Sequence, residues 1–141
     1  MKLKMMICIT ERKCGMSLLQ VNGLSGGYTK KLVLNDISFN VNAGELVGLI
    51  GLNGAGKSTT IKHIIGTMEQ KKGEIFINGK SLNGDVEQYR KQFSYVPETP
   101  VLYDELTLDE HLKLTAMAYN IPEKEFQSRK IQLLKEFKME K

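Results

Sequence analysis

The sequence predicts an α/β fold in which short strands alternate with helices around a glycine-rich loop. Residues 18–24 and 36–41 have strand character, and the second run alternates apolar and polar side chains. A short, mostly apolar run at 45–50 is suited to a buried strand, and the glycine-rich segment 51–56 follows it. Beyond that segment, apolar residues recur at the spacing of one helix face: Ile61, Ile64, Ile65 and Met68.

The next segment predicts a hairpin, a short helix and one more strand. Residues 74–77 alternate and end at Asn78-Gly79, a dipeptide that tolerates the positive φ angles of a tight hairpin. Residues 85–91 are polar and suit a short exposed helix. Residues 93–96 read as a strand that Pro97 ends.

The last part of the chain predicts two helices. Thr107 and Glu110 have the spacing of a capping box, which opens a helix through about residue 119. A second amphipathic helix is expected from Pro122 to Phe137. Its expected buried stripe is Phe126, Leu133, Leu134 and Phe137. The predicted organisation is a leader at 1–15, an α/β core at 16–100 and the start of a helical subdomain at 101–141.

The leader explains most of the net charge of +4, because residues 1–15 hold four basic residues and one acidic residue. The rest of the chain is nearly neutral and has no basic stripe, so nucleic-acid binding is not expected. Cys8 and Cys14 lack metal-ligand spacing and are interpreted as incidental thiols. We expect the leader to be disordered and Met16 to be the natural start. No apolar run approaches the ~20 residues of a membrane helix.

The loop itself carries the chemistry. Residues 51–58 read GLNGAGKS and fit the pattern G-x-x-x-x-G-K-[ST] at every fixed position. In such a loop the glycines let backbone N–H groups converge on phosphate oxygens, the lysine reaches the outer phosphates, and the hydroxyl coordinates Mg²⁺. The flanking strand and helix predicted above are the required context. The sequence therefore predicts binding of a nucleoside triphosphate.

With these residues in place, the chain resembles the ATP-binding subunit of an ABC transporter. The resemblance covers residues 16–141, and residues 98–103 look like the Ecs-type exporter branch. Its matching segments follow the family's order and spacing: 24–28, 33–39, 44–60, 73–75 and 95–97. It implies a P-loop NTPase core of ABC type, here with an incomplete sheet and the start of a helical subdomain.

The resemblance also implies roles for individual residues. Tyr28 would stack on the adenine ring, which an aromatic face can do without reading the base edges; packing on the core is the alternative. Lys57 would be catalytic, because it neutralises charge that builds on the γ-phosphoryl group. The remaining cofactor-binding residues would surround the phosphates: Asn53, Gly54, Ala55, Gly56, Ser58 and Thr59.

Glu98 departs from the family, most members of which carry a glutamine at this position. By resemblance it would be catalytic and would share Mg²⁺ with Ser58, since a carboxylate is a hard oxygen ligand. Its negative charge beside a polyphosphate could weaken ATP binding unless Mg²⁺ bridges the two. The alternative is a solvated loop acid without such a role.

Two segments imitate other motifs of the family. Residues 24–27 spell LSGG but precede the phosphate loop, where the signature does not belong. Residues 101–105 resemble a Walker B strand but follow Pro100 with no room for a buried strand. His63 and His111 both fall on predicted helices and are expected to be exposed or half-buried.

The signature, Walker B strand, general base and switch histidine are all absent from these 141 residues. The expected function is that of an N-terminal portion of an ABC-type ATPase that uses ATP and Mg²⁺. The intact relative would act as a dimer with a membrane-spanning subunit, at the cytoplasmic face of the cell membrane, to drive export. Two alternatives stay open, a non-catalytic nucleotide-binding module and a non-functional truncated remnant.

Overall fold

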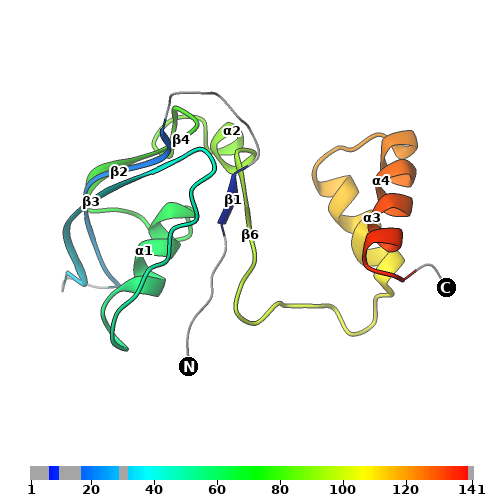
Figure 1. The fold of residues 1–141 in the computed structure, drawn as a ribbon, viewed down its shortest axis with the longest axis horizontal. Coiled ribbons are helices and arrows are strands. Elements are labelled where there is room, and N and C mark those ends of the chain that lie inside the picture. Colours follow the sequence, from blue (N-terminus) through cyan, green and yellow to red (C-terminus); the bar gives the residue numbers. More distant parts are fainter. Residues whose placement is uncertain (1–6, 10–16, 29–31, 140–141) are drawn as a thin grey trace. The chain divides into compact units, whose positions relative to one another are not determined.

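The computed structural model describes residues 7–9, 17–28 and 32–139, and it divides into two compact units, Met1–Glu98 and Thr99–Lys141 (Figure 1). The division lies close to the limit that the sequence suggested at residue 100. The first unit contains β1 (Ile7–Ile9), β2 (Ser17–Gly26), β3 (Leu34–Asn42), α1 (Lys57–Ile64), β4 (Lys72–Ile77), β5 (Lys80–Ser81), α2 (Val86–Arg90) and β6 (Phe93–Tyr95). The second unit contains α3 (Leu108–Ala118) and α4 (Glu123–Glu136).

An antiparallel sheet of four strands, in the order β3-β2-β4-β5, forms the centre of the first unit. On β2, Val21 pairs with Phe39 of β3 on one side and with Ile75 of β4 on the other. The side chains of Val21 and Ile75 are fully buried and share one apolar cluster with Ile64 of α1. The strands predicted at 18–24, 36–41 and 74–77 are therefore confirmed, and α1 packs on the sheet through its apolar face.

The predicted hairpin between β4 and β5 is also confirmed. Asn78 and Gly79 both adopt positive φ angles, 49° and 73°, and Ile77 pairs directly with Lys80. These angles are those of the two central residues of a tight turn whose twist matches that of the flanking strands.

The strand predicted at 45–50 is wrong. No described strand pairs with this segment, and Leu46 and Ile50 are 90% and 97% exposed. A buried strand of this apolar type needs hydrogen-bonded neighbours on both edges. Without such neighbours among the described residues, the segment is an irregular connection that leads into the glycine-rich loop.

Helix α1 ends earlier than its apolar spacing predicts. Gly66, with a φ of 71°, donates its N–H to the carbonyl of His63 at 3.1 Å, and Thr67 donates to that of Lys62 at 2.9 Å. These two bonds form a Schellman motif, in which the left-handed glycine terminates the helix. Ile61 and Ile64 are buried as predicted, whereas Met68 is half-buried and lies beyond the helix end.

Three residues of the leader are ordered as a strand. Ile7–Ile9 forms β1 and pairs antiparallel with β6, in the register Ile7 to Tyr95 and Ile9 to Phe93. The prediction for the leader as a whole stays a prediction. The rest of the leader, with Cys14 and the suggested start at Met16, lies outside the described residues.

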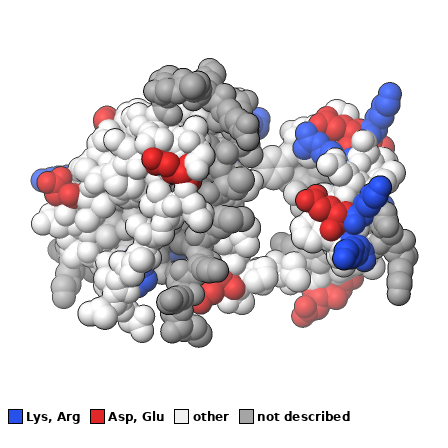
Figure 2. Space-filling view, viewed as in Figure 1, with Lys and Arg blue, Asp and Glu red and all other residues white. Residues whose placement is uncertain are grey.

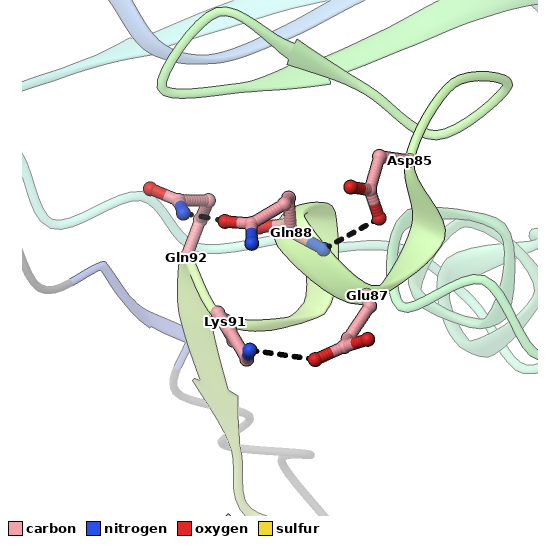
Figure 3. A network of polar contacts seen from close by, with 5 residues as sticks. All are labelled: Asp85, Glu87, Gln88, Lys91 and Gln92. Carbon is pink, nitrogen blue, oxygen red and sulfur yellow. Dashed lines mark hydrogen bonds and ion pairs between the residues drawn. The ribbon is translucent and has the colours of Figure 1, made fainter.

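The short helix predicted at 85–91 is confirmed as α2, and polar contacts define it. Asp85 caps its N-terminus by accepting a hydrogen bond from the backbone N–H of Gln88 at 3.1 Å (Figure 3). Lys91 and Glu87 form an ion pair of 2.6 Å one turn apart, and Gln92 donates to the carbonyl of Gln88 at 3.0 Å. These contacts satisfy both ends of a helix that is otherwise too short to be stable alone.

In the second unit, α3 and α4 confirm both predicted helices. Asn120, with a φ of 53°, ends the first helix, and an ion pair joins Lys130 of α4 to Asp109 of α3. The predicted stripe of α4 is only partly right. Phe126 is buried, whereas Leu133 and Phe137 are exposed. A single neighbouring helix covers only a narrow stripe of α4 within this unit, so the edges of the predicted apolar face remain open.

Charges of both signs are interspersed on the face of the second unit seen in Figure 2. No described helix combines the length and the apolar character that crossing a bilayer requires.

Candidate nucleotide site

The glycine-rich loop connects the exposed segment at 45–50 to α1 by two left-handed glycines. Gly54 and Gly56 have φ angles of 83° and 87°, which only glycine adopts without strain. Between them, Ala55 donates its N–H to the carbonyl of Leu52 at 3.1 Å and closes a tight turn. The loop thus folds back on itself directly before the first turn of the helix.

The first turn of α1 is open to a negatively charged ligand. Among the described residues, no side chain caps this helix and no acidic residue lies in its first turn. The first backbone N–H groups of a helix have no partner within the helix, and the helix dipole adds partial positive charge there. A phosphate group is the natural ligand for such an end.

Lys57 lies across the loop. Its amino group donates hydrogen bonds to the carbonyl oxygens of Gly51 at 2.7 Å and of Leu52 at 2.8 Å. These contacts curl the lysine side chain over the turn that precedes the helix. Because they are exposed hydrogen bonds to neutral carbonyls, each contributes only modestly, and a polyphosphate is a stronger acceptor for the same ammonium group.

The two hydroxyl residues after Lys57 have different environments. Both lie in the first turn of α1, where Ser58 is exposed and Thr59 is buried. The next residue, Thr60, is also buried, and its hydroxyl donates to the carbonyl of Gly56 at 3.0 Å. Ser58 therefore offers an exposed hydroxyl oxygen at the start of α1, whereas the two threonine side chains are buried.

Tyr28 is brought to the same helix from the far end of β2. The residue is 61% exposed, and its hydroxyl accepts a hydrogen bond from the amino group of Lys62 at 3.2 Å. Hydrogen bonds with Lys62 and Thr59 lower the pKa of the Tyr28 hydroxyl below its usual value. The structure thus places an exposed aromatic residue against α1, the helix that begins at the phosphate loop.

Glu98 is the predicted metal ligand that lies outside the glycine-rich loop in the sequence. Its side chain is exposed at the end of the first unit and makes no hydrogen bond or ion pair with a described residue. In the part of the chain that the structure describes, no group of three or more His, Cys, Asp or Glu side chains could hold a metal ion.

The two histidines differ in burial. His111 is half-buried as expected, and its Nε2 accepts a hydrogen bond from the backbone N–H of Tyr103 at 3.0 Å. The expectation is wrong for His63, which is fully buried, with Nδ1 3.0 Å from the carbonyl oxygen of Met68. His63 packs against the bare backbone of Gly26, where a Cβ would lie 2.4 Å from its Nε2.

Sequence reasoning missed the contact between Lys62 and Tyr28. The two residues are separated by 34 positions, and neither lies in a motif that links them. A lysine on the predicted helix, one turn beyond Ser58, was visible in the sequence, but nothing there indicated which side chain it meets.

The loop, its helix and its sheet match a known family. The family model described as ABC transporter matches residues 34–141, so this chain belongs to the ABC transporter family. It corresponds to part of the ATP-binding subunit of such a transporter, as the following relatives indicate.

The chain is 60% identical over 126 residues to the ABC-type transporter ATP-binding protein EcsA of Bacillus subtilis, and the match covers 89% of this chain and 51% of EcsA. It is 46% identical over 125 residues to the uncharacterized ABC transporter ATP-binding protein YthP of the same organism, covering 88% and 48%. A solved structure of the ATP binding subunit of an ABC transporter superposes with a TM-score of 0.78 at 61% identity, covering 88% and 52%. The chain spans about half the length of the curated relatives it matches.

Proposed function

We propose that this chain binds Mg-ATP at the loop before α1 and contributes that site to an ABC transporter that drives export. One observation carries the proposal. The N-terminus of α1 has no side-chain cap or first-turn acid among the described residues, and Lys57 is curled over it. A helix end of this kind stabilises a triphosphate through backbone N–H groups, the helix dipole and one ammonium group.

The proposed contacts divide the nucleotide into a base end and a phosphate end. Tyr28 stacks on the adenine ring with its exposed face. Lys57 reaches the outer phosphates and neutralises charge there. The backbone of the loop and the first turn of α1 surround the remaining phosphate oxygens: Asn53, Gly54, Ala55, Gly56, Ser58 and Thr59.

The residues present fit Mg²⁺ through their chemistry, since Ser58 and Glu98 are exposed and offer hard oxygen ligands. Mg²⁺ is held in proteins mainly by one or two such ligands together with substrate phosphates, so no larger cluster of protein ligands is needed. Bound there, the ion neutralises phosphate charge. Replacing Glu98 with Gln and measuring Mg-ATP affinity tests the metal role, and an unchanged affinity would remove Glu98 from the site.

ATP hydrolysis is the activity that the family implies, and we propose that the intact transporter subunit performs it. The 141 residues alone contain no signature or Walker B segment, so we expect them to bind nucleotide with turnover near background. We further propose that the intact subunit pairs with a second ATP-binding subunit and docks on a membrane-spanning subunit from the cytoplasmic side. The alternative function, a non-catalytic nucleotide-binding module, uses the same binding site and differs only in the absence of ATP turnover.

Calorimetry with the 141-residue chain and Mg-ATP tests the binding site. We expect measurable affinity in the millimolar range or tighter and a loss of about tenfold or more in Lys57→Met, because a charge-assisted contact is removed. Lys80→Met, which removes an exposed lysine from β5, is the matched control and should bind as the parent does. No heat at millimolar nucleotide would overturn the proposal, and turnover that Lys57→Ala abolishes would overturn the expected lack of hydrolysis.

A further inference from the structure

The contact between Lys62 and Tyr28 has a geometry suited to holding the ring while leaving its face open. The amino nitrogen of Lys62 lies 3.2 Å from the Tyr28 hydroxyl oxygen and 5.1 Å from the ring centroid. The lysine therefore contacts the hydroxyl end of the ring rather than its centre. Since Tyr28 as a whole is 61% exposed, its side chain is accessible to another planar group.

Two consecutive residues of helix α1 contact the end of β2 and the residues that follow it, up to Tyr28. His63 packs on Gly26 so closely that any side chain at that glycine would collide with the imidazole. Lys62, the residue before His63 on the helix, contacts Tyr28, which lies two residues after Gly26. The helix that begins at the phosphate loop thus fixes both the path of these residues and the direction of the aromatic ring.

We propose that Lys62 is a positioning residue for nucleobase binding, which holds the Tyr28 ring in the direction that stacks on the base. The inference rests on the proposed function of Tyr28 and adds to it a residue outside the phosphate loop. An exposed tyrosine at the end of a strand has rotamer freedom that must be lost when a base stacks on it. A ring that is already held loses less, so the base binds more tightly.

The ratio of the affinity for Mg-ATP to the affinity for inorganic tripolyphosphate separates this role from a general effect of charge. ATP carries a base, whereas inorganic tripolyphosphate presents a comparable phosphate chain without one. In the 141-residue chain we expect Lys62→Met to weaken Mg-ATP binding by about three- to tenfold while tripolyphosphate binding stays unchanged, a size typical of losing the hydrogen bond that holds the ring. Lys62→Arg should restore most of the ratio, because arginine can also donate to the hydroxyl.

Two further variants complete the experiment. Lys80→Met removes a lysine charge from β5 and should leave the ratio at the parent value. Tyr28→Ala should lower the ratio at least as far as Lys62→Met does. Lys62 is exposed, so its replacement should leave the melting temperature of the chain near that of the parent.

The outcomes distinguish this inference from the function on which it rests. A ratio that falls in Tyr28→Ala but not in Lys62→Met overturns the positioning role alone. A ratio unaffected by Tyr28→Ala overturns base stacking and the positioning role together. Equal weakening of ATP and tripolyphosphate in Lys62→Met shows that the lysine acts on phosphate charge, which also overturns the inference.

Discussion

Leu34 of β3 packs directly against the backbone of Gly56, since a Cβ at Gly56 would lie 2.6 Å from Cδ2 of Leu34. Leu34 belongs to the buried cluster of the sheet. The last glycine of the phosphate loop therefore rests on the hydrophobic core, and the position of the loop follows from the packing of the sheet.

This contact predicts that Gly56→Ala is more harmful than Gly54→Ala. Both glycines have left-handed φ angles, so alanine is strained at either position by about 1 kcal/mol. At Gly56 the new methyl group meets a buried side chain, whereas no atom of the described residues lies within 4 Å at Gly54. We expect Gly56→Ala to lower the free energy of unfolding, measured in urea, by about 1–3 kcal/mol more than Gly54→Ala does. Equal losses would contradict the contact, and Leu34→Ala should reduce the difference.

Tyr89 predicts a loss of stability at high pH. Its hydroxyl is buried and donates to the carbonyl of Ile64, the last residue of α1, at 2.6 Å. Burial raises the pKa of Tyr89 well above its usual value of about 10. Above pH ~10 the unfolded chain releases the proton and the folded chain keeps it, so stability falls by up to about 1.4 kcal/mol per pH unit.

The matched variants for this prediction are Tyr89→Phe and Tyr95→Phe. The first should cost about 1–2 kcal/mol at neutral pH, because the Ile64 carbonyl loses its donor, and should flatten the alkaline slope. The second removes the hydroxyl of an exposed tyrosine and should keep the slope. Denaturant unfolding between neutral and alkaline pH provides the measurement, and an unchanged slope in Tyr89→Phe would refute the prediction.

The capping box of α3 predicts a loss of stability at low pH. Hydrogen bonds from the backbone and then the side chain of Thr107 lower the pKa of Glu110. A lowered pKa in the folded state means that the contribution is present at neutral pH and is lost as pH falls below the usual range of a glutamate. Glu110→Gln should remove this part of the acid dependence of the helical signal in circular dichroism, and Glu105→Gln in the preceding loop should not. An identical acid response in both variants would rule out the box as its source.

The exposed apolar segment at 45–50 predicts that replacing an apolar side chain there changes the stability of the chain very little. Ile50→Ser should change the free energy of unfolding by less than about 0.5 kcal/mol, because the side chain is almost fully exposed. Ile75→Ser, at a fully buried position of β4, should cost about 2–5 kcal/mol. Exposed apolar groups promote association, so Ile50→Ser should also reduce self-association in sedimentation velocity. A large loss of stability in Ile50→Ser would show that the segment is packed.

Local signals in the sequence were sufficient for most of the fold. Alternation located β2, β3 and β4, the Asn78-Gly79 pair located the hairpin, and the Thr107–Glu110 spacing located the start of α3. The end of α1 was not predicted correctly, because the apolar spacing continues to Met68, past Gly66 where the helix terminates. Each of these features depends on residues that are close together in the chain.

Features that depend on distant neighbours were not predictable in this way. Residues 45–50 have the composition of a buried strand, but strand formation requires hydrogen-bonded partners that lie elsewhere in a chain. The burial of His63 depends on Gly26, and the position of Tyr28 depends on Lys62. The phosphate loop was recognisable because its chemistry is contained in consecutive residues, whereas the environment of the proposed base end is assembled from two elements.

The pairing of β2 with both β3 and β4 has a consequence for synthesis on the ribosome. Leu19 of β2 pairs with Val41 and with Ile77, so the second pairing closes a loop of chain that contains the whole of α1. Such a closure forms only after its last residue has emerged, and contacts this far apart form slowly. A nascent chain therefore holds the lysine and glycines of the loop without their supporting core until β4 has left the exit tunnel.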